Sequence, residues 1–417
     1  MVALLRGNRD LRLLFFAQVV SYLGDWFADV ALLGLVLDLS DSPLAAGGLM
    51  VATMLPVFLV TPLAGPMVDR LDRRRLVIAV SLCQCLFALT LLAVSESTLW
   101  LAFLARAGVA ALGAFVAPAA QAAIPNLVEP EDLPRANALL GSVWGAMLAV
   151  GAAVGGAFAV AFGRDAAFVA DAATFVVAAA LIAGVRRPMN APRPAAGTRL
   201  RPIADTVDAV RYAAGHRPVL LLLFSKTGLG LAGGVVPLLA VYGTDVFHGG
   251  DAAIGLLLAA RGMGALLGPL FARRHAARGT PTILLVCGAA GLVYGIGYLG
   301  VAASPVLGVA LVAAFVAHLG GGAQWTLSNI GLQSETPDEL RGRIFAADFA
   351  LVTLTMSTSF LLSGWGSDTF GPRPVTVALA LVASTWGVAY LTLTRTIRRP
   401  EPVHAGALAG ADGPPAR

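Results

Sequence analysis

Two long apolar runs that meet at a short, densely charged segment constrain the fold of this chain more than any other feature. The runs cover residues 44–68 and 76–95, and their junction reads Gly65-Pro66-Met67-Val68-Asp69-Arg70-Leu71-Asp72-Arg73-Arg74-Arg75-Leu76. Each run can cross a bilayer as a helix, which takes about 20 residues. Helices joined so closely are antiparallel, with the junction at a membrane surface. The arginines indicate the cytoplasmic surface, because basic loops stay inside.

Composition supports a membrane protein rather than a soluble one. Hydrophobic residues make up 58% of the chain and charged residues 13%, whereas about 25% of residues are charged in soluble proteins. The basic residues lie in short loops rather than on one soluble face, which argues against a nucleic-acid partner. Cys83, Cys85 and Cys287 fall in apolar runs and provide neither a disulfide framework nor zinc-ligand spacing.

The apolar runs predict an all-α integral membrane protein with twelve transmembrane helices. The predicted spans are 11–37, 44–68, 76–95, 98–122, 136–162, 166–185, 219–244, 253–272, 282–303, 306–330, 344–367 and 374–394. They divide the chain into a six-helix bundle (1–185), a cytoplasmic linker (186–217), a second six-helix bundle (218–395) and a cytoplasmic tail (396–417) that we expect to be disordered. Apolar residues at helical spacing over 203–214 predict a surface helix in the linker.

The distribution of charge sets the predicted topology. Of 29 basic residues, only Arg164 and Arg373 fall in predicted outside loops, while Arg106, Lys226 and Arg261 fall within spans. The other basic residues lie on the opposite side, which predicts a multi-pass protein of the cell membrane with both termini in the cytoplasm. We expect a monomer in contact with the lipid bilayer.

The two halves of the chain repeat each other. Leu-Ala-Gly-Pro at 63–66 recurs as Leu-Leu-Gly-Pro at 266–269, and the acidic loop 129–135 is echoed at 336–341 at nearly the same offset. Such a repeat is typical of two pseudo-symmetric bundles related by an axis along the membrane normal.

The charged junction resembles the loop between helices 2 and 3 of major facilitator superfamily transporters, Gly-x-x-x-Asp-Arg-x-Gly-Arg-Arg. The matching residues are Gly65, Asp69, Arg70, Arg73 and Arg74, and Asp72 stands where the family has a second glycine. The resemblance implies the major facilitator fold and alternating access around a cavity bordered by helices 1, 4, 7 and 10.

Further stretches are similar to the drug:proton antiporter branch that holds macrolide-efflux pumps and the enterobactin exporter. They are 21–25, 115–128 with 136–139, 167–175 and 333–343. The resemblance implies a secondary transporter that uses the proton gradient and no cofactor. Gly151, Gly155 and Gly156 in helix 5 match an exporter element that lacks its proline here, and they fit a seam of small residues equally well.

Buried charges in the first half are candidates for proton coupling. A charge at the bilayer centre costs about 2.5–3.5 kcal/mol on insertion scales and needs a partner or water. Asp25 lies at the predicted midplane of helix 1, and Asp29 lies one turn outward at the depth of Arg106 in helix 4. We expect Asp29 to pair with Arg106, leaving Asp25 without a cation to carry the proton. The opposite assignment stays open, as does a packing or capping role for Asp25.

Helix 10 of the second half carries a polar and aromatic stripe of His318, Trp325 and Asn329. His318 is a candidate titrating group, although a lone histidine in a span is more often a satisfied hydrogen-bonding residue. Lys226 can snorkel toward the cytoplasm. Arg261 needs an acidic partner, with Asp171 and Asp348 both open. The residues predicted to border the substrate cavity are Tyr22, Trp26, Lys226, Arg261, Trp325 and Asn329.

The junction itself predicts a cytoplasmic gate. Asp69, held by Arg70 and Arg73, would face the start of helix 11 after Arg341 and Arg343, where free backbone amides favour an anion. Gly65 and Arg74 complete the predicted gate.

The favoured function is a proton-coupled exporter of amphipathic small molecules such as drugs, antibiotics or siderophores. An importer or facilitator of a small polar metabolite is the alternative, followed by a membrane receptor that transports nothing. An enzyme is disfavoured, because the sequence has no phosphate-binding loop, nucleophile–base set or metal-ligand spacing.

Overall fold

The computed structural model describes residues 2–190 and 211–398, and within these ranges the regular structure is helical with no strand. Twelve helices in the described ranges are long and apolar enough to cross a membrane, as predicted. The helices of the N-terminal half are α1 (Val2–Gly7), α2 (Arg9–Ser40), α3 (Pro43–Arg70), α4 (Arg73–Thr90), α5 (Trp100–Leu127), α6 (Leu133–Phe162) and α7 (Arg164–Ala183). Short 3₁₀ turns lie at Leu91–Ala93, Glu96–Thr98 and Pro130–Asp132.

The C-terminal half begins with a span in four pieces. These are α9 (Arg217–Ser225), α10 (Thr227–Leu231), α11 (Val235–Val241) and the π-helical turn η4 (Tyr242–Val246). The helices that follow are α12 (Gly250–Ala276), α13 (Thr280–Ala303), α14 (Leu307–Glu335), α15 (Asp338–Phe370), α16 (Pro372–Leu393) and α17 (Arg395–Arg398). Of the predicted surface helix, 211–214 is helical and 203–210 lies outside the described residues, as do residues 399–417 of the predicted tail.

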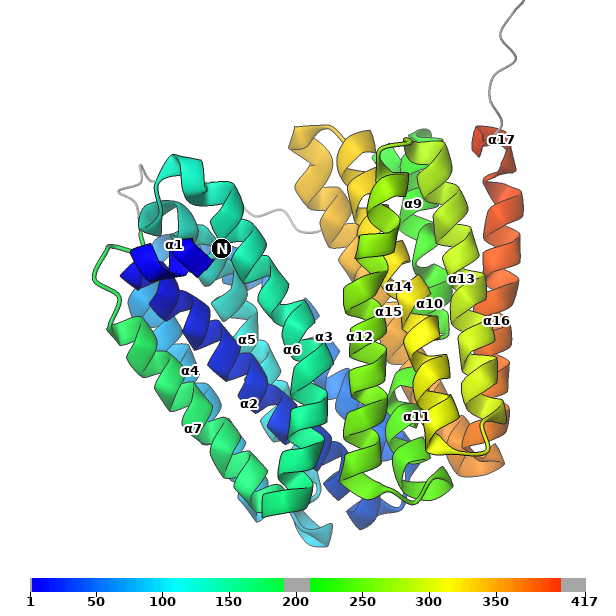
Figure 1. The fold of residues 1–417 in the computed structure, drawn as a ribbon, viewed down its shortest axis with the longest axis horizontal. Coiled ribbons are helices and arrows are strands. Elements are labelled where there is room, and N and C mark those ends of the chain that lie inside the picture. The colour runs from blue at the N-terminus through cyan, green and yellow to red at the C-terminus, as the bar shows by residue number, and fades with distance from the viewer. Residues whose placement is uncertain (1, 191–210, 399–417) are drawn as a thin grey trace, which may run out of the picture.

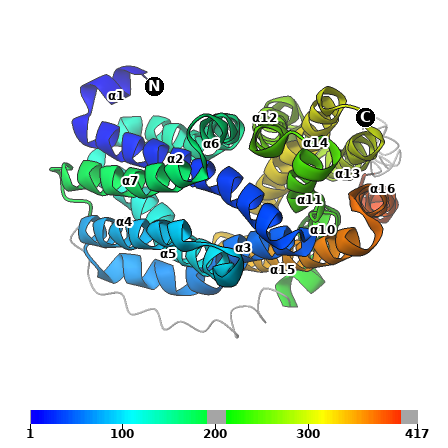
Figure 2. The same ribbon diagram turned by 90° about the horizontal axis from the view of Figure 1, so that it is seen from below.

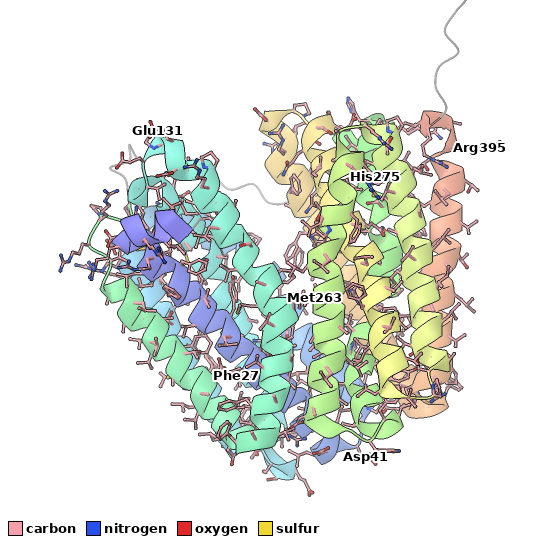
Figure 3. The ribbon with its side chains drawn as sticks, viewed as in Figure 1. Phe27, Asp41, Glu131, Met263, His275 and Arg395 are labelled. Atoms are coloured by element: carbon pink, nitrogen blue, oxygen red, sulfur yellow. The ribbon has the colours of Figure 1, made fainter. Side chains whose placement is uncertain are left out.

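The two halves stand side by side with their long helices running between two ends of the molecule (Figure 1). We call the end that holds α1 and α17 the terminal end, and the opposite end the distal end. Glu131, His275 and Arg395 lie at the terminal end, and Asp41 lies at the distal end (Figure 3). Seen from below, α3 lies beside α15 and α6 faces α12 (Figure 2). These two helix pairs form the interface between the halves.

The interface is closest toward the distal end, where small residues let backbones touch. A Cβ atom on Gly255 of α12 would lie 2.7 Å from the carbonyl oxygen of Ala152 on α6, and one on Gly47 of α3 would lie 2.4 Å from the carbonyl oxygen of Phe360 on α15. At the terminal end, Gly65 and Gly141 have no heavy atom within 4 Å of the same position. The halves are therefore packed together distally, and their ribbons diverge toward the terminal end (Figure 1).

The charged junction turns without the second glycine of the family pattern. Leu71 is extended at φ −92° and ψ 159°, and Asp72 has a φ of −66°. The Asp72 carboxylate accepts a hydrogen bond of 2.8 Å from the backbone amide of Arg75 and so caps α4. No positive φ is needed at this point, and an aspartate is the better cap.

The seventh span was predicted as one helix over 219–244, and the structure interrupts it twice. Glycines are weak helix formers, and this stretch contains Gly228, Gly230, Gly233 and Gly234. Ser359 of α15 accommodates the second break, because its hydroxyl donates to the carbonyl of Leu231 (2.6 Å) and accepts from the amide of Gly234 (2.8 Å). Backbone groups freed within a bilayer need such partners.

Candidate functional site

The N-terminal half contains the ion pair predicted between the first and fourth spans, which are α2 and α5. Nε of Arg106 on α5 lies 2.8 Å from Oδ1 of Asp29 on α2, and its NH2 group donates to Oδ2 at 2.9 Å. Nε also donates to the hydroxyl of Thr53 on α3 at 3.2 Å. The two charged side chains are only 14% and 16% exposed. Charge-assisted, bidentate contacts of this kind hold both side chains in one geometry.

Asp25 lies one turn away from Asp29 on α2 and is half-buried. Among the residues that the structure describes, its side chain forms no ion pair and accepts no hydrogen bond, although Arg106 and Asp29 are near enough to act on its charge. Tyr22 lies beside it. The arrangement agrees with the expectation that Asp29 takes the arginine and Asp25 is left without a cation of its own.

Trp26, a predicted cavity residue, has a packing partner. A Cβ on Gly151 of α6 would lie 2.6 Å from Cδ1 of the Trp26 indole, and one on Gly155 would lie 2.6 Å from the Trp26 carbonyl oxygen. The indole therefore fills the seam between α2 and α6. Gly151 and Gly155 leave room for it, because they have no side chain. Gly156 faces the other way, against Gly255 of α12.

The C-terminal half holds a second buried charge cluster at the first break of the seventh span. Lys226 follows α9, and its ammonium group donates to Asp348 of α15 and to Oδ1 of Asn329 on α14 (2.7 Å). The ammonium also lies 4.8 Å from the centre of the Trp325 ring, within reach of a cation–π contact. Only 1% of the Lys226 side chain is exposed, so the expected snorkelling is wrong: the carboxylate of Asp348 keeps the lysine inside.

Neither acid considered as a partner for Arg261 fills that role. Asp348 is engaged by Lys226, and Asp171 of α7 lies in the N-terminal half near Asp25 and Arg106. Arg261 on α12 instead lies near Tyr294 and His318, and its Nε is buried without a hydrogen-bond acceptor among the described residues. Sequence spacing could not reveal this, because pairing depends on which helices become neighbours.

His318 is a satisfied buried residue in the structure. Its Nε2 is 2.8 Å from the Tyr298 hydroxyl, and its ring meets the Tyr294 ring edge-on with centroids 5.1 Å apart. Both tyrosines are on α13, so His318 lies in the seam between α13 and α14. This contact favours the hydrogen-bonding role over a relay.

The predicted gate residues gather at the terminal end. Asp69 is 58% exposed and lies 3.5 Å from the guanidinium of Arg73, whose side chain is only 3% exposed. Arg73 donates to the carbonyls of Ala122 (2.8 Å) and Met189 (3.0 Å), which joins the loop to α5 and to the start of the linker. Arg70 is exposed, Gly65 and Arg343 are half-buried, and Arg74 bonds the Ala183 carbonyl.

Arg341 lies across from this loop, at the start of α15. It pairs with Asp338 and donates to the carbonyls of Gln333 (3.0 Å) and Thr336 (3.2 Å). It therefore fastens α15 to the end of α14.

A polar contact across the distal end was missed by sequence reasoning. Arg164, the first residue of α7, donates to Asp251 of α12 through Nε (2.8 Å) and NH2 (2.9 Å), and to Asp38 of α2 through NH1 (2.7 Å). Asp368 of α15 accepts from the Ser42 hydroxyl at 3.0 Å. We call Arg164, Asp38 and Asp251 the distal lock. The one available signal was that Arg164 is one of two basic residues predicted on that side.

Comparison with known proteins agrees with this architecture. The sequence profile of the Major Facilitator Superfamily matches residues 14–347. The enterobactin exporter EntS of Citrobacter koseri is 28% identical over 372 residues, 82% of each chain. The multidrug efflux pump Tap of Mycolicibacterium fortuitum is 27% identical over 402 residues, which is 92% of this chain and 96% of that one.

Solved structures share the fold. An inward-facing, unoccupied bacterial homologue of the human lysosomal transporter Spinster superposes with a TM-score of 0.73 at 17% identity, over 94% of this chain and 98% of that chain. The protein is a transporter and not an enzyme, like the members of the family it matches. The twelve-helix architecture and the profile match across most of the sequence together show that the chain belongs to the Major Facilitator Superfamily.

Proposed function

We propose that this transporter exports amphipathic small molecules in exchange for protons, by alternating access between its two halves. The observation that carries the proposal is the unequal environment of two acids one turn apart: Asp29 holds Arg106, and Asp25 has no cation of its own. A lone carboxyl group within a membrane is neutralised by a proton when dry and can release it when water arrives. In this proposal Asp25 is the proton carrier. The Asp29–Arg106 ion pair fixes the part of α2 on which Asp25 lies.

The broken seventh span supports a substrate site in the C-terminal half. Discontinuous helices border the central sites of many secondary transporters. Here Lys226 lies at the first break and donates a hydrogen bond to Asn329 of α14. The Trp325 ring beside them is 42% exposed. An exposed ring next to amide and charged groups suits a molecule with an apolar body and a polar part. Met263 of α12, 38% exposed, lies on the side toward the N-terminal half (Figure 3).

Export is favoured over import because the two curated relatives described above carry the names of exporters. We place the terminal end in the cytoplasm of a cell-membrane protein, because the arginine-rich loops lie there. In that orientation the present arrangement, packed distally and with ribbons that diverge toward the terminal end, is inward-facing. The transporter then works as a monomer, driven by the proton gradient without a cofactor.

Alternating access requires one closure at each end. The distal lock joins α7 and α12 directly and so holds the halves together there. At the terminal end we assign Asp69 to the opposite closure, in which its exposed carboxylate meets the amide groups at the start of α15. One set of contacts breaks as the other forms.

A compound-susceptibility panel, on cells with and without the protein and with and without a protonophore, tests the proposal. We expect the protein to protect cells against at least one amphipathic compound and the protonophore to remove that protection. Protection that survives collapse of the proton gradient would rule out proton coupling. Greater sensitivity in cells that make the protein would indicate uptake instead.

A further inference from the structure

Asp171 is a buried acid to which the proposed function assigns no role. It lies on α7, and 2% of the residue is exposed. Its Oδ1 is fully buried and accepts no hydrogen bond from the described residues. A Cβ on Gly24 of α2 would lie 2.8 Å from this oxygen, so the carboxyl group lies against the backbone next to Asp25. An acceptor buried in this way is costly unless it is neutralised.

The helices packed against Asp171 bring few charged groups to it. Helix α2 presents Tyr22, Asp25 and Asp29, α5 presents Arg106, and α4 presents Cys85. Helix α6 contains no ionisable residue except Arg135 near its terminal end, and the turn at Leu91–Ala93 contains none. The cluster thus holds three carboxyl groups and one cation.

The cation is already used. Arg106 makes two contacts to Asp29, at 2.8 and 2.9 Å, and no ion pair joins it to Asp25 or Asp171 among the described residues. Two ionised carboxylates near each other in a membrane interior repel, so at least one of them must hold a proton. Asp171 is the more deeply buried of the two, since 2% of it is exposed, whereas Asp25 is half-buried.

We propose that Asp171 is a second proton-binding carboxyl group of the transporter, which takes its proton from Asp25 and returns it during the cycle. In the transfer, the O–H bond on Asp25 breaks, an O–H bond on Asp171 forms, and the negative charge moves from Asp171 to Asp25. No other reactant is needed. The proposal deepens the proposed function, because it adds a proton store behind the carrier.

Infrared difference spectroscopy on the purified full-length protein tests this with the proton as the only probe. Spectra taken in acidic and alkaline buffer show the carbonyl bands of the carboxyl groups that change protonation. We expect Asp171→Asn to remove one pH-dependent band and Asp171→Glu to shift it. Asp165→Asn is the matched control, because Asp165 is an exposed acid on the same helix and its replacement should leave the Asp171 band in place. Wild-type bands in both Asp171 variants would overturn the proposal.

The route through Asp25 has its own readout. After transfer to heavy water the Asp171 band shifts as its proton is replaced by deuterium, and Asp25→Asn should slow that shift severalfold. An unchanged exchange rate would show that Asp171 does not receive its proton from Asp25. None of these spectra needs a transported compound, so a failure here and a failure of the susceptibility panel are separate results. If Asp171→Asn does not fold, the band of Asp171→Glu decides.

Discussion

Lys226 and Asp348 form an ion pair with only 1% and 6% of their side chains exposed, at a break in the seventh span. The removal of one member of a buried pair leaves an uncompensated charge and typically costs about 3–5 kcal/mol, whereas replacement of both by apolar residues is often neutral. We therefore expect Lys226→Met to lower the thermal stability of the protein in detergent strongly. The double variant Lys226→Met/Asp348→Leu should recover most of it. Equal losses of thermal stability in the single and double variants would show that the ion pair does not account for the stability lost in Lys226→Met.

Asp25→Asn should abolish proton-driven transport while leaving substrate exchange down its own gradient intact. The reason is that asparagine keeps the size and polarity of the neutral acid but cannot release a proton. The measurement compares the two modes in vesicles, with the first compound found in the susceptibility panel. Asp165→Asn is the control. Retained proton drive in the Asp25 variant would refute its assignment as the carrier.

Arg164→Gln should open the distal end. Hydrogen bonds to charged groups contribute about 1.5–3 kcal/mol each, so loss of the Asp251 contacts shifts the population by about tenfold or more. The readout is disulfide cross-linking of cysteines placed at Ser42 and Asp368, which are in contact here, in a chain without Cys83, Cys85 and Cys287. We expect slower cross-linking than in the parent.

Asp38→Asn is the graded control for the distal lock. It removes only the negative charge of the more exposed acid, which is 57% exposed against 10% for Asp251, and should have a smaller effect than Arg164→Gln. The lock is refuted if neither change alters the cross-linking rate.

Gly255→Ala should weaken the interface between the halves. The added Cβ would lie 2.7 Å from the backbone oxygen of Ala152, which no side-chain rotation relieves, and overpacking of this kind typically costs about 1–3 kcal/mol. Gly141→Ala on α6 has open space at the same position and should be tolerated. Thermal unfolding in detergent compares the two, and similar melting temperatures would contradict the tight seam.

Asp69→Asn should favour the state that is open at the terminal end, because it removes the anion from the closure assigned to it. Asp69 is 58% exposed here, so the change should leave the stability of the present state within about 0.5 kcal/mol. A cysteine at Gly141 reports the opening through its rate of alkylation, which should rise. Asp72→Asn, which keeps a capping side chain, is the control. Equal rates in the Asp69 variant and its parent would count against the gate.

The sequence was sufficient for the parts of the structure that depend on periodicity and length. The twelve spans follow from apolar runs matched to the thickness of a membrane, and their order along the chain suffices to define two halves. The Asp29–Arg106 pair was also predictable, because two residues at one depth in neighbouring helices have few other partners. Depth is a one-dimensional quantity that can be counted along a helix.

Tertiary structure alone decided which helix faces meet. In the structure Asp348 pairs with Lys226 and not with Arg261. Asp171 lies near Asp25, and Arg164 joins the two halves at the distal end. These contacts join residues far apart in the chain, and a helix can turn any of its faces toward a neighbour without changing its hydropathy. The sequence by itself thus determined that the chain spans a membrane twelve times and where along each span its charges lie. Side-chain packing between helices determined the rotation of each one, and with it which charges are satisfied and which are left to bind a proton.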